Sequence, residues 1–357
     1  MDAMTATRSS SPLPALQEEM LNAMLLFLPL DDALSMARTS NTLRDGLHAA
    51  STYWTHVTLT EATSTMLKQL VPFAKHIRRL TCIKSTASEE AWIHFACHTK
   101  HLEVLNVAGS KHFSHVALTA FAELNSSSLV EVYADNCAYI ANTSALKNCA
   151  AQLRVLSLSR CRQLTTADIV TLVQEAPKLT VLNLKGCPHI SPVDVLTSAT
   201  SCCPQLQTLT LGGSGRFVKD VNLHLTTAFG STRSLSLEYL DLSCSNPFGS
   251  RSPLSNEGLE PLLRSAPMLK ELSLKGHSNL TRDVFEAMPK GLTSLDLTGC
   301  TRLALDLNAL GNFQALEQLT VLLCPNVDVT SVQHLQDSNA NLTKVDIEAR
   351  PSPVAVH

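Results

Sequence analysis

The sequence contains few aromatic residues and almost no net charge. Phe, Trp and Tyr make up only 4% of the 357 residues, whereas 45% are hydrophobic, so the apolar content is mainly aliphatic. Lysine and arginine total 28 against 31 aspartates and glutamates, a formal charge of −3 without long runs of like charge. This composition argues against a disordered chain, and against nucleic acid or an anionic membrane as the main partner.

Long apolar runs and an even cysteine set are also lacking. The longest apolar run, residues 20–30, is too short to cross a bilayer, and the first fourteen residues hold no apolar core of a secretory signal. Eleven cysteines, an odd number in a long chain, indicate reduced thiols rather than a disulfide scaffold. We therefore expect a soluble intracellular protein, cytoplasmic or nuclear.

One short apolar pattern recurs along the chain. It consists of an apolar residue, two residues, an apolar residue, one residue and an apolar residue, as in Leu153, Leu156 and Leu158. The pattern occurs twelve times at intervals of 23 to 32 residues, which predicts a solenoid stabilised by the stacking of neighbouring units. Its first residues are Trp54, Ile77, Leu102, Leu129, Leu153, Leu179, Leu206, Leu237, Leu269, Leu292, Leu316 and Leu342.

Two further columns have the same register. The eleventh residue after the first apolar position is nearly always apolar and is expected to close the turn after each strand. The eighth residue is small, which predicts a buried position where volume matters more than sulfur chemistry. Its members are Cys137, Cys161, Cys187, Cys300 and Cys324 in five units and Ser85, Ser110, Ser214 and Ser245 in four others.

Residues 54–349 resemble the cysteine-containing class of leucine-rich repeat. The resemblance is clearest in residues 153–165 (LRVLSLSRCRQLT) and 179–191 (LTVLNLKGCPHIS). It implies an α/β solenoid of about 12 units, with parallel strands on the concave face and helices, such as residues 115–124 and 166–175, on the convex face. Residues 1–12 are expected to be a flexible segment and residues 350–357 a C-terminal tail.

Residues 13–53 do not follow the repeat and are expected to form a small all-α domain. A plain helical cap for the end of the solenoid is one interpretation. The other is a resemblance to the F-box, from which the segment departs at Gln17, Thr39, Ser40 and Leu43. The matching residues are Leu16, Glu19, Met20, Leu21, Met24, Leu28, Pro29, Asp31, Asp32, Leu34 and Trp54.

The F-box resemblance implies a substrate receptor of an SCF-type cullin-RING ubiquitin ligase. The helical domain would bind a Skp-family adaptor of the cullin complex, while the repeats hold an unidentified target protein. The implied adaptor-binding residues are Leu16, Met20, Met24, Leu28, Pro29 and Leu34. The alternative is a scaffold subunit of a large ciliary, axonemal or organellar assembly, with a degenerate F-box as the cap.

Side chains that alternate with the core leucines are expected on the concave face and form the candidate target site. They carry slightly more acid than base, with Tyr133 and Tyr239 as candidate anchors. The candidates are Arg79, Glu131, Tyr133, Asp135, Lys185, Tyr239, Asp241, Glu271, Lys275 and Asp296. The two longest repeat intervals, after Leu206 and Leu237, predict rim loops, and Ser252-Pro253 in the second is a candidate phosphorylation site.

No catalytic motif is present, and we predict a protein that is not an enzyme and needs no cofactor. Residues 212–215 (GGSG) lack the context of a nucleotide-binding loop. His94, Cys97, His98 and His101 would share one face of a continuous helix, but their spacing matches no structural zinc signature. We expect no metal there, with Cys97 pointing inward as in a repeat.

Overall fold

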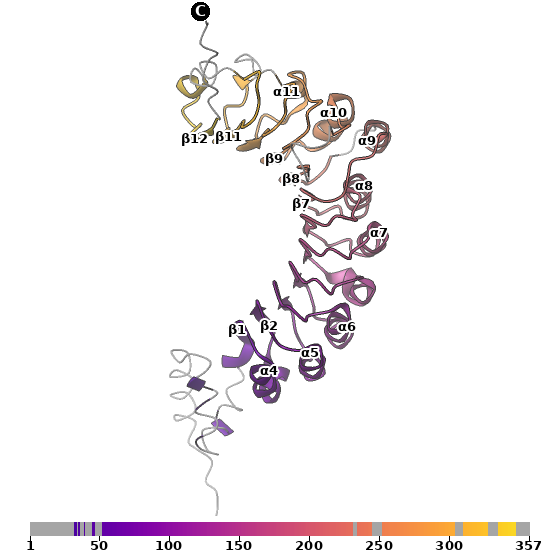
Figure 1. Ribbon diagram of the computed structural model, residues 1–357, viewed down its shortest axis with the longest axis vertical. Coiled ribbons are helices and arrows are strands. Elements are labelled where there is room, and N and C mark those ends of the chain that lie inside the picture. The colour runs from indigo at the N-terminus through magenta and orange to yellow at the C-terminus, as the bar shows by residue number, and fades with distance from the viewer. Residues whose placement is uncertain are drawn as a thin grey trace, which may run out of the picture.

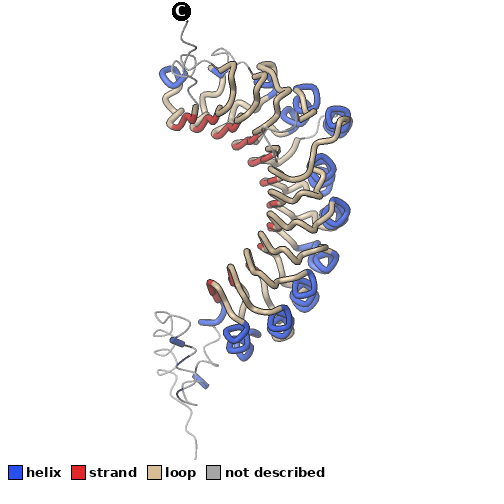
Figure 2. Tube along the Cα trace, viewed as in Figure 1, coloured by secondary structure: helices blue, strands red, loops and turns tan. Residues whose placement is uncertain are grey.

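A computed structural model shows a single curved array of repeats. The structure describes residues 52–230, 234–244, 252–303, 310–327 and 335–347, together with six scattered positions between 32 and 46. Its strands line the inner side of an arc and its helices the outer side (Figures 1 and 2). The predicted solenoid, with parallel strands on the concave face and helices on the convex face, is confirmed.

Twelve parallel strands form one sheet in which each strand pairs with its neighbours in the chain. The central apolar residue of every predicted unit lies within its strand, and in β3 to β12 it is the middle residue, so that Leu182, for example, pairs with Leu156 and Leu209. The strands are β1 (His56–Thr60), β2 (Arg79–Ile83), β3 (Val104–Asn106), β4 (Glu131–Tyr133), β5 (Val155–Ser157), β6 (Val181–Asn183), β7 (Thr208–Thr210), β8 (Tyr239–Asp241), β9 (Glu271–Ser273), β10 (Ser294–Asp296), β11 (Gln318–Thr320) and β12 (Lys344–Asp346).

Most helices on the outer side begin at a serine or threonine cap. Thr165 forms a capping box with Asp168, and Ser114 accepts hydrogen bonds from two backbone amides of the helix that it precedes. The α-helices are α4 (Ser64–Leu70), α5 (Glu89–Ala96), α6 (His115–Leu124), α7 (Thr166–Gln174), α8 (Pro192–Cys202), α9 (Val221–Phe229), α10 (Asn256–Ser265) and α11 (Val284–Ala287). Three 3₁₀ helices also lie in the described part of the chain, at Tyr53–Thr55, Val71–His76 and Ser144–Gln152.

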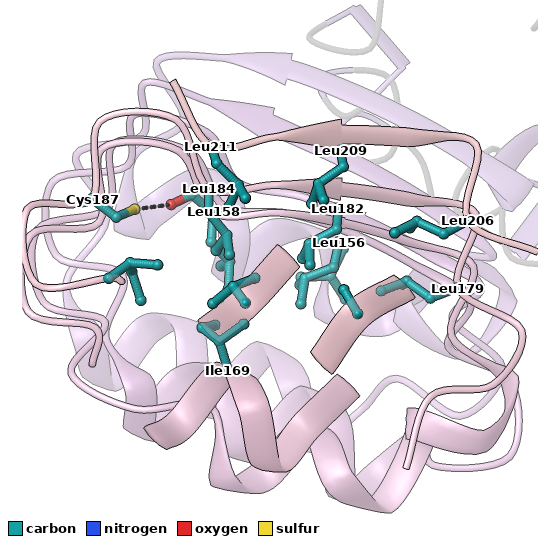
Figure 3. Close-up of a cluster of buried hydrophobic side chains, with 14 of the residues drawn as sticks. Leu156, Leu158, Ile169, Leu179, Leu182, Leu184, Cys187, Leu206, Leu209 and Leu211 are labelled. Carbon is teal, nitrogen blue, oxygen red and sulfur yellow. Dashed lines mark hydrogen bonds between the residues drawn. The ribbon is translucent and has the colours of Figure 1, made fainter. Parts of the chain in front are cut away.

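The core is a continuous aliphatic layer between the sheet and the helices. Figure 3 shows Leu156, Leu182 and Leu209 stacked behind successive strands, with Ile169 of α7 facing them. All four side chains are fully buried. Because each repeat covers the apolar face of the next, no unit is stable alone. No helix in the described part of the chain is both long and apolar enough to cross a membrane.

The described residues of the eighth column are buried as predicted, and they also make a hydrogen bond that the sequence did not reveal. The Sγ of Cys187 donates to the carbonyl oxygen of Leu158 in the preceding repeat at 3.2 Å (Figure 3). The hydroxyl of Ser214 donates in the same way to Leu184, at 2.8 Å. The column is therefore defined by a donor as well as by small volume, which explains why serine can replace cysteine.

Most predictions for the N-terminal segment lie outside the described residues. These include all six adaptor-binding candidates, Leu16, Met20, Met24, Leu28, Pro29 and Leu34. Trp54 is described: it is fully buried and its ring stacks on Phe73 with 3.8 Å between the ring centroids. It therefore serves as the first core residue of the solenoid.

Candidate functional site

Four of the predicted target-binding residues form an N-terminal concave cluster on β2, β4 and the turn after β4. Arg79 lies 3.7 Å from Glu131, reaching across β3. The hydroxyl of Tyr133 donates to the same Glu131 carboxylate at 3.0 Å. Partial burial, followed by this hydrogen bond, raises the pKa of Tyr133. Tyr133 is thus held in one orientation before any partner binds, which lowers the entropic cost of using it as an anchor.

Asp135, the fourth member, is restrained by the neighbouring repeats. One of its carboxylate oxygens accepts hydrogen bonds from the Ser157 hydroxyl at 2.6 Å and from the Ser159 amide at 2.7 Å. Ser157 in turn accepts from the Asn183 side chain at 2.9 Å. These bonds connect β5, β6 and the turn after β4 into one polar network on the concave surface, so Asp135 contributes to the rigidity of the site as well as to its charge.

Tyr239, Asp241, Glu271 and Asp296 form a C-terminal concave cluster on β8, β9 and β10. Burial and the negative charge of the three carboxylates raise the pKa of Tyr239. Glu271 and Asp296 have no ion-pair partner among the described residues. This part of the concave face is therefore anionic around a half-buried tyrosine ring, a setting that favours a cationic side chain of a partner.

Asp241 differs from a solvated strand position, because its side chain is only 2% exposed. One carboxylate oxygen lies 3.2 Å from the Nζ of Lys185, which reaches it from the turn after β6. The Asp241 carboxylate lies against Gly212, where a Cβ atom would overlap this carboxylate and the Ser243 hydroxyl. Asp241 is therefore a structural member of the site that holds Lys185 in place, rather than a free contact residue. Lys275, in contrast, forms no ion pair with a described residue.

Comparisons with known proteins address the fold. No family model matches the sequence, and no curated protein matches it at a significant level. Rad7, in the crystal structure of the yeast Rad7 and Elc1 complex, is similar to the chain with a TM-score of 0.63 and 17% identity, over 88% of this chain and 89% of that one. An internalin (InlF) from Listeria monocytogenes gives a TM-score of 0.52 and 14% identity, over 96% and 95% of the two chains. The fold is a leucine-rich repeat solenoid.

His277 is a residue of this leucine-rich repeat solenoid that the sequence reasoning missed. It lies eight residues after Leu269, so it occupies the cysteine column and could have been found from the register. Its Nε2 donates to the Leu242 carbonyl oxygen at 2.9 Å, replacing the thiol donor of other repeats. The ring is fully buried, and this burial lowers the pKa of His277 to about 4. His277 is therefore neutral at physiological pH.

The longer repeat around His277 accommodates the larger side chain. Ser252, from the insertion after β8, lies 2.8 Å from His277 Nδ1 and is only 5% exposed. Asn279 donates to the Ser252 carbonyl oxygen, and Asn222 donates to that of Pro253. The candidate phosphorylation site at Ser252 is therefore buried in the folded repeat. Residues 245–251 of the same insertion lie outside the described part.

The four histidine and cysteine residues at the end of α5 and in the segment after it are not gathered around one point. Helix α5 ends at Ala96, so the continuous helix face expected for the four residues is interrupted. His98 Nδ1 lies 2.8 Å from the His94 carbonyl oxygen, and Cys97 is exposed rather than pointing inward. Across the described ranges, no three histidine, cysteine or carboxylate side chains come together to bind a metal ion.

Proposed function

We propose that this chain is a non-enzymatic substrate-recognition subunit of an SCF-type cullin-RING ubiquitin ligase, acting in the cytoplasm or nucleus. The observation that carries the proposal is the solenoid with two clusters of oriented side chains on its concave face. The F-box-like segment at residues 13–53 supports the adaptor half of the proposal by resemblance. Rad7, which was crystallised with Elc1, is a further example of this fold in a complex with another protein.

Target binding is assigned to the concave clusters around Tyr133 and Tyr239. Both rings are half-buried and belong to strands four positions apart in the sheet. At about 4.8 Å between strands, the two rings lie on the order of 20 Å apart, within the width of an ordinary protein interface. Aromatic side chains of this kind are frequent hot spots because they lose little rotamer entropy on binding.

Adaptor binding is assigned to the apolar stripe of the first predicted helix and the Leu-Pro step that follows it. A helix bound in a groove draws its affinity from a few buried apolar anchors. In this sequence the proposed anchors are Leu16, Met20, Met24, Leu28, Pro29 and Leu34. The solenoid would then position the target relative to the adaptor and the cullin.

Affinity purification followed by mass spectrometry tests the adaptor half. We expect Skp-family adaptor and cullin peptides with the parent protein, and their loss on replacing Met24 and Leu28 by aspartate. Met268→Asp is the matched control, because Met268 is 59% exposed on the solenoid. Absence of the adaptor from the parent purification, with a stoichiometric structural complex in its place, would favour the scaffold interpretation.

A second pair of variants tests the target half. The Tyr133→Ala, Tyr239→Ala double variant should no longer capture the proteins that the parent chain captures, because its binding to them is weakened by about 2 kcal/mol or more. It should still capture the adaptor. Leu223→Ala is the control, because Leu223 is 66% exposed on α9, outside the two clusters. Equal loss of target in the control variant would refute the assignment to the concave face.

A further inference from the structure

The turns that follow β2 to β7 carry an excess of positive charge that the proposed concave site does not use. They stack along one edge of the solenoid, on the Cys187 side of the core in Figure 3. These turns, residues 84–88, 108–114, 135–143, 159–165, 185–191 and 212–220, hold seven cations and only two carboxylates, Asp135 and Asp220. We call this surface the basic edge. Its cations are Lys84, Lys111, Arg160, Arg162, Lys185, Arg216 and Lys219.

Six of the seven cations are available to a partner. All seven side chains are exposed. Lys185 is paired with Asp241, but none of the other six has an ion-pair partner among the described residues. Of the two carboxylates, Asp135 is already engaged by Ser157 and Ser159. The first turns of the helices that follow add the carboxylates of Glu89, Glu90, Asp168 and Asp194, of which Glu89 and Asp168 bind Ser114 and Thr165 of the edge. The excess of positive charge is therefore confined to the turns themselves, which lie next to a concave face that carries several carboxylates.

Two of the cations lie at the left-handed backbone position that recurs along the edge. Lys84 and Arg160 have φ values of 54° and 59°, the left-handed region that Gly109, Gly186 and Gly213 occupy at the equivalent position. A non-glycine residue there has a conformational cost, which glycine would avoid. The side chain of Lys84 lies beside Gly109 and that of Arg160 beside Gly186, where a Cβ atom would come within 3.4 Å and 3.3 Å of the two Cγ atoms.

We propose that the basic edge binds an acidic segment of a protein partner, a run of aspartate and glutamate side chains. Guanidinium groups such as those of Arg160 and Arg162 pair with carboxylates in bidentate geometry. From the second to the seventh repeat the edge spans about 24 Å, which matches an extended peptide of about seven residues. The concave carboxylates beside it repel a long polyanion that would cross the sheet, which favours a short acidic peptide over a nucleic acid.

The proposal rests on the receptor role proposed above, because it names the chemistry of a target segment. Fluorescence anisotropy of the full chain with a fluorescein-labelled peptide of about eight alternating glutamates and aspartates tests it. A peptide with glutamine and asparagine at the same positions is the control ligand. We expect saturable binding of the acidic peptide only, weakened several-fold between about 50 and about 300 mM NaCl.

Matched variants locate the binding. Arg160→Glu, Arg162→Glu should weaken the acidic peptide about tenfold or more, and the neutral pair Arg160→Gln, Arg162→Gln should weaken it less. Arg154→Glu, Lys178→Glu makes the same charge change at exposed, unpaired residues before β5 and β6, on the opposite edge, and should change affinity less than about twofold. Circular dichroism checks that all variants are folded.

Several outcomes overturn the proposal. Equal weakening by the two charge-reversal variants would mean that only the net charge matters, and absence of saturable binding would mean that the edge has no such ligand. Tighter binding of a phosphorylated peptide or of polyuridylate, lost in the Arg160 and Arg162 variant, would assign the edge to a different ligand. Adaptor capture is measured separately, so peptide binding without adaptor capture, or the reverse, shows which of the two proposals fails.

Discussion

The buried imidazole of His277 is expected to make the stability of the solenoid depend on pH. In the folded state its Nε2 donates to Leu242, and its Nδ1 accepts from the Ser252 hydroxyl, so the neutral ring is fully satisfied. The neighbouring thiol of Cys244, 3.7 Å from Nδ1, is uncharged because burial raises its pKa. Asp241 is the acidic group that favours protonation of the ring, but it does not offset the burial.

The sign and magnitude follow from the two protonation equilibria. The unfolded chain binds a proton at His277 near the ordinary pKa of 6.5, whereas burial lowers the folded pKa to about 4. The free energy of unfolding therefore has its full value above pH 6.5 and decreases as the pH falls from 6.5 towards 4. At about 1.36 kcal/mol for each pH unit, the loss from this one residue is about 3 kcal/mol.

Urea denaturation followed by circular dichroism between about pH 7.5 and about pH 4 measures this loss. The chain has 13 histidines, so the comparison must be with a variant that differs at one of them. His277→Cys restores the residue of the other repeats; it leaves a cavity and lowers stability at high pH, but its stability should decline less steeply with acid. Parallel pH profiles for the parent and variant would show that His277 does not titrate as the buried geometry requires.

Three further predictions concern the core and the concave face. Cys187→Phe should overpack its layer and cost about 1–3 kcal/mol in denaturation experiments, whereas Cys187→Ser should be milder because Ser214 makes the same hydrogen bond. A native thiol-labelling experiment should modify the exposed Cys97 quickly and the buried Cys187, whose pKa burial raises to about 11, only on unfolding. Gly212→Ala should cost about 1–3 kcal/mol by displacing the Asp241 carboxylate and the Ser243 hydroxyl, and Asp241→Ala in the same chain should recover the part of that loss that is due to the carboxylate; additive losses would contradict the overlap.

The repeat architecture was predictable because one local rule is applied twelve times. Leu182 lies between Leu156 and Leu209 in the sheet because each repeat must present the same apolar residue to a shared core. If one unit had been placed wrongly, its eighth and eleventh residues would no longer have been a small and an apolar residue. The strand positions and the buried cysteines were therefore confirmed by the structure, even where intervals reach 32 residues.

Contacts between repeats were not predictable in the same way. Asp241 occupies a strand position that the alternation assigns to solvent, yet it is buried because Gly212 in the preceding repeat has no side chain. Ser252 belongs to an insertion with the composition of a surface loop, yet it is held against His277. The burial of Asp241 and of Ser252 depends on which side chains stand in the neighbouring repeats. A periodic pattern describes each repeat separately and does not contain this information.

Lys185 lies at the junction of the concave face and the basic edge, and its contacts indicate how the two surfaces would share a partner. Its ammonium group neutralises Asp241, whose carboxylate is 2% exposed. If a partner carboxylate drew Lys185 away, the buried Asp241 carboxylate would keep one hydrogen-bond donor among the described residues, the Ser243 amide at 2.9 Å. Arg160 and Arg162 can bind a partner without leaving a buried carboxylate unpaired, because neither pairs with a described carboxylate. An acidic segment should therefore draw its affinity from the arginines, while Lys185 remains on Asp241 and separates the segment from the anionic surface around Tyr239.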